Sequence, residues 1–236
     1  IKNDKIRFYD KIPELASLKG LSSTRSIKGF RSDPDAVYVC CSYEPYIYKV
    51  SGDASSIKVD ETWTLTDGGG GNPISLDRDP AGNIWIVTRN NLMVRTPAGA
   101  YVNVMKNEDG NDFNDIKCDS HGNAWVATNL NGLVKISEFS PGVSGKPHFT
   151  ITKMPDVPGG SVSKIDVDNV SKRVWCVSNY DDFFMVDMST GEVSDRSEKL
   201  NSIINGGIQN FVVDNDGNVW FTTNNNVCEY NTETDG

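Results

Sequence analysis

The chain has 236 residues, of which 37% are hydrophobic, 23 are Lys or Arg and 32 are Asp or Glu, giving a formal net charge of −9. This composition is typical of a globular domain with a sizeable core and excludes a disordered chain. An acidic chain without a cluster of basic residues is not expected to bind nucleic acid. No apolar run reaches the roughly 18 residues of a membrane helix, so no membrane segment is expected within the chain.

A short motif recurs along the chain. Asp, a Gly-Asn turn and an apolar run with Trp occur at residues 79–85, 119–125 and 214–220. A degraded copy with a longer turn and no glycine lies at residues 168–175, and residues 33–38 carry Tyr in place of Trp. The anchor aromatic residues are therefore Tyr38, Trp85, Trp125, Trp175 and Trp220. This recurrence predicts five copies of one structural unit.

Each copy is expected to contain four antiparallel strands. An inner strand ends in the Asp of the motif, the anchor strand follows the turn, and two further strands complete the unit. In chain order, the third strands are expected at residues 46–50, 92–95, 133–136, 183–186 and 227–230, and the fourth strands at 62–66, 101–105, 149–153 and 192–195. Four strands per repeat predict an all-β fold, with residues 1–236 forming a single β-propeller domain of four-stranded antiparallel blades. Anchor strands that are apolar on both faces place their Trp side chains in blade cores.

The ends of the chain allow two interpretations of the ring. The last repeat lacks a fourth strand, and Lys5 to Tyr9 has the apolar-polar pattern of one. If this strand pairs beside Val227 to Tyr230, the chain closes a five-bladed ring and removes an exposed sheet edge. The same pattern arises at any cut through a larger propeller. A closed ring and an arc of a larger propeller therefore both remain open.

The anchor strands resemble a known repeat. Trp85–Thr88, Trp125–Thr128 with Asn131–Leu133, and Trp220–Thr223 are similar to the two-component regulator propeller repeats in periplasmic sensor regions of bacterial hybrid histidine kinases. In this chain Val, Ala or Thr replaces the Gly that precedes Thr in that family. The resemblance implies a non-catalytic, ligand-sensing segment of a bacterial sensor, periplasmic or extracellular, that detects carbohydrate. Its partners would be other domains of the same sensor or a second subunit.

Two competing functions remain open, a propeller enzyme and a protein-binding scaffold. Residues 216–222 are also similar to the repeat of streptogramin lyases, whose propellers use a His and a divalent metal near the axis. His121 is expected in a hairpin turn and His148 at an outer strand, so neither is expected to line the channel. The sequence contains no nucleophile elbow, phosphate-binding loop or metal-ligand spacing, so no catalytic residue, metal or cofactor is predicted.

Candidate ligand-binding residues lie in the loops between second and third strands, which propellers place around the channel mouth. Amides dominate these loops, together with a guanidinium and two phenol rings. Amides both donate and accept hydrogen bonds, and aromatic faces cover sugar C–H groups, which suits a neutral or mildly anionic oligosaccharide or a similar small molecule. The predicted residues are Tyr43, Arg89, Asn90, Asn129, Tyr180 and Asn224.

Overall fold

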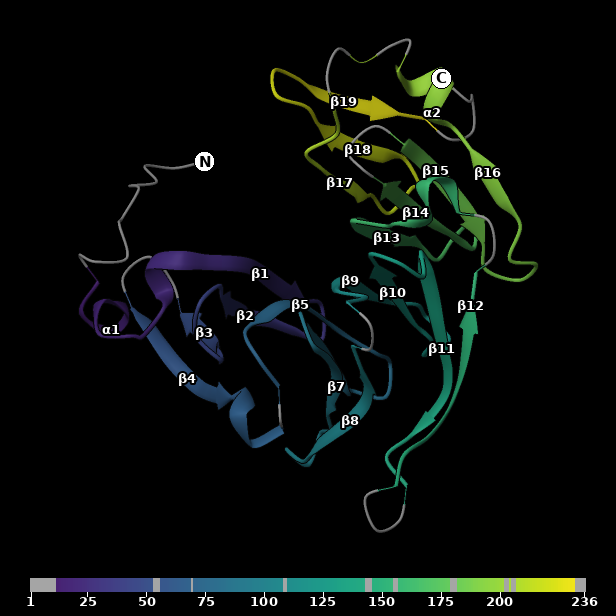
Figure 1. Cartoon of the computed structure of the whole chain (residues 1–236). Coiled ribbons are helices and arrows are strands. Elements are labelled where there is room, and N and C mark those ends of the chain that lie inside the picture. The colour runs from purple at the N-terminus through teal and green to yellow at the C-terminus, as the bar shows by residue number, and fades with distance from the viewer. Residues whose placement is uncertain are drawn as a thin grey trace.

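The structure, a computed structural model, describes residues 12–52, 56–68, 70–107, 110–142, 146–154, 157–178, 182–201, 204 and 207–231. Its strands form five antiparallel sheets that follow one another around an arc (Figure 1). Four sheets contain four strands each, and the described part of the last contains three. Strand order within every sheet follows chain order. The predicted all-β propeller fold is confirmed.

Each sheet is one blade, and its first strand lies nearest the axis of the arc. The first blade contains β1 (Thr24–Phe30), β2 (Asp33–Cys41), β3 (Tyr46–Gly52) and β4 (Ile57–Thr64). The second contains β5 (Pro73–Arg78), β6 (Ile84–Thr88), β7 (Asn91–Arg95) and β8 (Tyr101–Lys106). The third contains β9 (Phe113–Cys118), β10 (Ala124–Thr128), β11 (Leu133–Ser140) and β12 (His148–Lys153).

The remaining two blades repeat this order. The fourth contains β13 (Lys164–Asp168), β14 (Arg173–Ser178), β15 (Asp182–Asp187) and β16 (Val193–Asp195). The fifth contains β17 (Asn210–Val213), β18 (Val219–Thr222) and β19 (Val227–Tyr230). Two short helices, α1 (Pro13–Ala16) and α2 (Ser197–Asn201), and three 3₁₀ turns at Leu21–Ser23, Leu65–Gly68 and Pro158–Gly160 lie outside the sheets.

The fourth strand of the first blade begins earlier than the sequence predicted. We expected it at residues 62–66, whereas β4 spans Ile57–Thr64. The reason is that β3 continues to Gly52, which pairs with Ile57, so the hairpin between the two strands closes sooner. The other predicted third and fourth strands agree with the structure to within a few residues.

Apolar clusters fill the space between neighbouring blades. We call the side of a blade that contacts the next blade along the chain its leading face, and the opposite side its trailing face. Trp85 of the second blade packs in one cluster with Val126 of the third, and Trp125 of the third with Cys176 of the fourth. Trp175 packs in the same way with residues of the fifth blade. Trp85, Trp125 and Trp175 therefore project from leading faces and are buried by the following blade.

The Asp of the motif holds both the turn and the anchor aromatic residue in the second, third and fifth blades. Asp79 accepts hydrogen bonds from the Asn83 backbone N–H at 2.9 Å and from Trp85 Nε1 at 3.0 Å. Asp119 makes the same pair of contacts with its own turn and with Trp125. In the first blade Tyr replaces Trp, and the Tyr38 hydroxyl donates to Asp33 at 2.7 Å. One carboxylate thus orders a turn and fixes a core side chain.

The degraded fourth repeat loses this contact. Its turn has an additional residue, and both Trp175 Nε1 and Asp168 Oδ2 are buried with no hydrogen-bond partner among the described residues. Asp168 still orders the turn, because its other oxygen accepts from the backbone of Val170 and Ser171. The Asp of the fourth blade therefore keeps only one of the two functions that a single carboxylate performs in the second, third and fifth blades.

Trp220 is not in a blade core, and the sequence prediction for this residue is wrong. Trp85 and Trp125 are 0% exposed and Trp175 is 1% exposed, whereas Trp220 is 39% exposed. The difference arises because Trp220 projects from the leading face of the last blade, and no following blade covers that face in the described part of the chain. The predicted closing strand at Lys5 to Tyr9 lies outside the described residues.

We predict that the Asp contact stabilises each blade substantially. Asp119→Ala removes the acceptor of the Asn123 backbone and side-chain N–H groups and of Trp125 Nε1, which are 2.7 to 3.0 Å away. Leaving these groups unpaired should lower the free energy of unfolding by about 2 to 4 kcal/mol. Urea unfolding measures the change, and Asp216→Ala, an exposed position in the corresponding turn of the last blade, is the matched control. Equal losses in both variants would contradict this account.

Candidate ligand-binding site

The inner strands carry an alternating set of charges along the channel. The residue that pairs with the anchor aromatic residue is Lys28 in β1, Asp77 in β5, Lys117 in β9 and Asp166 in β13. In β17 the same position is Val212. We call the first four residues the charge ladder. They lie on leading faces, so each can reach the inner strand of the following blade.

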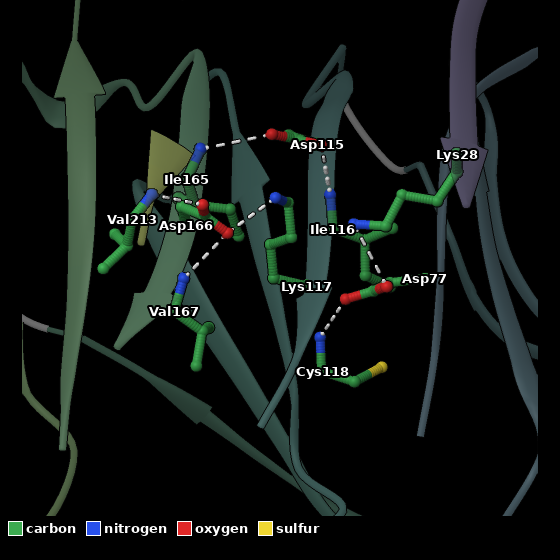
Figure 2. Close-up of polar contacts among 10 residues, drawn as sticks. All are labelled: Lys28, Asp77, Asp115, Ile116, Lys117, Cys118, Ile165, Asp166, Val167 and Val213. Atoms are coloured by element: carbon green, nitrogen blue, oxygen red, sulfur yellow. Dashed lines mark hydrogen bonds and ion pairs between the residues drawn. The ribbon is translucent and has the colours of Figure 1, made fainter. Parts of the chain in front are cut away.

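The first part of the ladder joins the first three blades. Lys28 Nζ lies 3.3 Å from Asp77 Oδ1, and Asp77 Oδ2 accepts a hydrogen bond from the Cys118 backbone N–H at 2.8 Å (Figure 2). The Asp77 side chain is 12% exposed. Because a carboxylate that is largely removed from water requires charged or N–H partners, this contact favours one arrangement of the three inner strands.

The second part of the ladder joins the last three blades. Lys117 Nζ lies 2.7 Å from Asp166 Oδ1, and Asp166 Oδ2 accepts from the Val213 backbone N–H at 2.8 Å (Figure 2). Burial alone would lower the pKa of the Lys117 ammonium group, but the carboxylates of Asp166, Asp115 and Asp77 outweigh it and raise that pKa above its ordinary value. Lys117 therefore stays charged at neutral pH.

Asp115 adds a further connection closer to the channel mouth. One of its carboxylate oxygens accepts from the Ile116 backbone N–H at 2.9 Å, and the other accepts from the Ile165 backbone N–H of the next blade at 3.2 Å (Figure 2). Asn114 donates from Nδ2 to the Val162 carbonyl at 2.7 Å, which also joins the third blade to the fourth. Polar side chains of the inner strands thus fix neighbouring blades on the side where the strands begin.

A polar cavity of about 620 Å³ opens where the inner strands begin. All five blades contribute to its wall. Small polar residues supply much of the lining, and two loops between second and third strands complete it. Its lining includes Arg25, Ser75, Asn114, Asn129, Lys164 and Gln209.

The cavity wall carries more positive than negative charge, although the chain is acidic overall. Arg25 of the first blade and Lys164 of the fourth line it, together with a single carboxylate, that of Asp115. Both oxygens of Asp115 are occupied by backbone N–H groups. Within the described ranges, neither Arg25 nor Lys164 forms an ion pair. Two cations from different blades in the wall of a polar cavity favour an anionic ligand.

Of the six residues predicted to bind ligand, the structure places Asn129 in the cavity wall. Its side-chain oxygen accepts from Asn114 Nδ2 at 2.7 Å. Tyr43 is 78% exposed and follows Ser42, which lines the cavity.

Arg89, Asn90 and Asn224 do not line the cavity. Arg89 is directed to Asp112, with 3.4 Å between Nε and Oδ2. Asn90 and Asn224 are exposed in their loops, and Tyr180 lies outside the described residues. The sequence-based prediction missed Arg25, Lys164 and Gln209, because it considered the loops after the anchor strands and not the starts of the inner strands.

The two histidines lie away from the cavity, as the sequence predicted. His121 is in the turn between β9 and β10, and His148 begins the outer strand β12. Among the described residues, no group of three or more His, Cys, Asp or Glu side chains is placed to hold a metal ion. The described helices include none with the length and apolarity needed to cross a membrane.

One segment of the chain matches a family model. Residues 202–225, which include β17 and β18, match the two-component regulator propeller family. The resemblance that the anchor strands indicated is confirmed over this segment. No curated protein matches the chain.

Several solved structures share the fold. A catalytically inactive virginiamycin B lyase from Staphylococcus aureus with quinupristin is 16% identical, and the match covers 92% of this chain and 69% of that chain with a TM-score of 0.68. The extracellular domain of a hybrid two-component system from B. thetaiotaomicron is 18% identical, with 89% of this chain and 28% of that chain covered and a TM-score of 0.64. The extracellular domain of a one-component system from the same organism is 16% identical, with 89% and 26% covered and a TM-score of 0.61. At these identities the likeness establishes the fold.

We predict that the second ion pair of the ladder stabilises the arc. Lys117→Met leaves the largely buried Asp166 carboxylate without its cation, which should lower the free energy of unfolding by about 2 kcal/mol. Lys58→Met is the control, because the pair of Lys58 with Asp60 is at the surface, where Lys58 is 69% exposed, and should change stability by less than about 0.5 kcal/mol. Adding Asp166→Asn to Lys117→Met should recover part of the loss. A Lys117→Met protein as stable as the control would contradict the role of the ladder.

Proposed function

We propose that this chain, which carries a two-component regulator propeller repeat at residues 202–225, is a non-catalytic, ligand-sensing segment of a bacterial sensor that acts in the periplasm or outside the cell. The repeat match and the shared fold with extracellular domains of one- and two-component systems support this proposal. The observation that carries it is the cavity at the start of the inner strands, because one ligand there would contact every blade.

The lining of the cavity favours an acidic carbohydrate. Ser75, Asn129 and Gln209 offer hydroxyl and amide groups that both donate and accept hydrogen bonds. Arg25 and Lys164 add positive charge from two different blades. A sugar with a carboxylate or sulfate group combines hydroxyls for the first set with an anion for the second. A volume of about 620 Å³ is within the range of small-molecule sites and suits an oligosaccharide fragment.

The proposed mechanism is a shift in the packing between blades. Arg25 and Lys164 belong to the first and fourth blades, so an anion held between them draws together parts of the arc that are distant in sequence. A ligand that binds one arrangement of blades more tightly than another increases the population of that arrangement. Other domains of the sensor, or a second subunit, would respond to the change in the outer surface of the blades.

A lyase is the second candidate function, since the virginiamycin B lyase fold covers 92% of this chain with a TM-score of 0.68. The positions of the two histidines favour sensing. His121 lies in the turn where β9 ends, whereas the cavity opens where the inner strands begin, and His148 lies on an outer strand. Release of product from a bound ligand, followed by chromatography, distinguishes a lyase from a sensor that returns its ligand unchanged.

Binding of acidic oligosaccharides tests the proposal. In a thermal-shift screen, uronic-acid or sulfated fragments should raise the melting temperature, whereas neutral fragments of the same length should raise it less. Titration calorimetry should show that Arg25→Ala and Lys164→Ala each weaken binding about tenfold, because each removes a charge-assisted contact of about 1.5 kcal/mol.

Arg89→Ala is the matched control for these two variants. Its side chain is 77% exposed beside Asp112 and does not line the cavity. Unchanged affinity in Arg89→Ala with weaker binding in the other two supports the site. Acidic fragments that bind all three variants as tightly as the original protein would refute it.

A further inference from the structure

The fourth repeat carries a lysine at a place where the other tryptophan repeats carry glycine. Counted back from the anchor tryptophan, Lys172 corresponds to three glycines of the other blades, Gly82, Gly122 and Gly217. These glycines have φ angles of 86°, 85° and 85°, and Lys172 keeps a left-handed backbone with a φ of 55°. A side chain at positive φ crowds its own backbone, so lysine is an unfavourable choice here. Such an outlier indicates that the side chain itself has a function.

Two more basic residues depart from the repeat in the neighbouring third blade. Lys135 in β11 pairs with Trp125. In the second and fourth blades the residue that pairs with the tryptophan is apolar, Val94 or Met185. His121 lies immediately before the glycine of its turn, where the second blade has alanine. Comparison with the other repeats therefore shows that packing of a blade does not require a basic residue at these positions.

The three basic residues line one cleft between the third and fourth blades. The cleft has a volume of about 250 Å³. His121 belongs to the turn between β9 and β10, Lys135 to β11, and Lys172 to the turn between β13 and β14. The cleft thus adjoins the turns where inner strands end, whereas the cavity of the proposed function opens where these strands begin. The two sites lie at opposite ends of the inner strands.

The positive charge of this cleft has no short contact with a carboxylate. Within the described ranges, His121, Lys135 and Lys172 form no ion pair. Asp119 is the acidic residue of the lining, and both of its oxygens accept from N–H groups of its own turn and of Trp125. The cleft therefore combines basic side chains with a carboxylate that is directed away from them.

Contacts with Met188 bring the two lysines together from different blades. The Lys172 carbonyl accepts a hydrogen bond from the Met188 backbone N–H at 3.0 Å. Lys135 Nζ lies 3.5 Å from the Met188 carbonyl and 5.2 Å from the centroid of the Trp125 ring. Asp187, the next residue, accepts from backbone N–H groups of its own turn. The ammonium group of Lys135 is thus positioned by weak contacts that leave N–H donors for a ligand.

We propose that His121, Lys135 and Lys172 bind a tetrahedral oxyanion, a phosphate or sulfate group, in this cleft. Three donors from three separate segments can each contact a different oxygen of such a group, whereas a carboxylate offers two oxygens. Lysine binds phosphate as a point charge, and an imidazole N–H adds a hydrogen bond. The volume of the cleft accommodates a free anion or the same group as an ester. This site is separate from the cavity of the proposed function and does not depend on it.

NMR titration with inorganic phosphate tests the proposal at constant pH and ionic strength. The imidazole Cε1–Hε1 signal of His121 should shift and saturate as phosphate is added. His148 provides an internal control, because it is also exposed but begins the outer strand β12. A His121 shift no larger than that of His148 overturns the proposal.

Substitutions at Lys172 separate the charge of the side chain from the strain of the backbone. Lys172→Gly restores the residue of the other turns, so in buffer without phosphate or sulfate it should raise the melting temperature by about 2 °C. The same variant should weaken phosphate binding about tenfold, because it removes a charge-assisted contact. Lys172→Arg retains the charge and should bind phosphate nearly as tightly as the original protein. A Lys172→Gly protein with unchanged phosphate affinity would overturn the assignment.

Two further measurements distinguish the source of the oxyanion and the two sites of the chain. Tighter binding of a sulfated monosaccharide than of inorganic sulfate supports an ester as the ligand, and the reverse supports a free anion. Lys164→Ala, in the other cavity, should leave the His121 titration unchanged. If Lys164→Ala abolishes that titration as fully as Lys172→Gly does, the separate site is refuted.

Discussion

Carboxylates that accept backbone N–H groups of the neighbouring inner strand are the constraint on which the rest of the structure depends. Asp77 accepts from Cys118, Asp115 from Ile165, and Asp166 from Val213, although each carboxylate belongs to the preceding blade. Neighbouring inner strands do not pair as a sheet, since each sheet is a single blade. The carboxylates therefore join neighbouring blades at the axis, and the apolar clusters join the same blades farther out.

This arrangement explains why the cavity is polar and why it contains separated charges. Side chains near the axis must satisfy the backbone of the next blade, which selects Asp and Asn there. Asp115 directs both of its oxygens to backbone N–H groups, and among the described residues it forms no ion pair with the cations of the wall. Arg25 and Lys164 are then available to a ligand. In the proposed function, the ligand and the contacts between blades share the inner strands, so a bound ligand would change the packing of the blades.

The fold was predictable because the repeat determines its own packing. An Asp six residues before Trp orders the turn and holds the indole, so five occurrences of Asp and an aromatic residue indicated five blades. The exposure of Trp220 could not be predicted from the motif, because burial depends on the following blade and not on the residue. The start of β4 differed from the predicted start for a similar reason, because it depends on how far β3 extends.

The candidate site was less predictable. The sequence-based prediction included Asn129, which lines the cavity, but it did not include Arg25 and Lys164, which line it as well. The ladder had a signal in the sequence, because Asp77 and Lys117 both lie eight residues before the Trp of their blade. The sign of the charge alternates along the ladder, so a search for one repeated residue type does not find it. A search for repeated position, with any charged residue allowed, would have found it.

Amide hydrogen exchange resolved by NMR tests the central claim most directly. If the carboxylates join the inner strands, the backbone N–H groups of Cys118, Ile165 and Val213 exchange only when the whole arc unfolds. Their exchange rates should then equal those of the slowest amides in the anchor strands β6 and β10. Fast exchange at these three amides, with the anchor strands still protected, would show that the inner strands separate freely and would contradict the account.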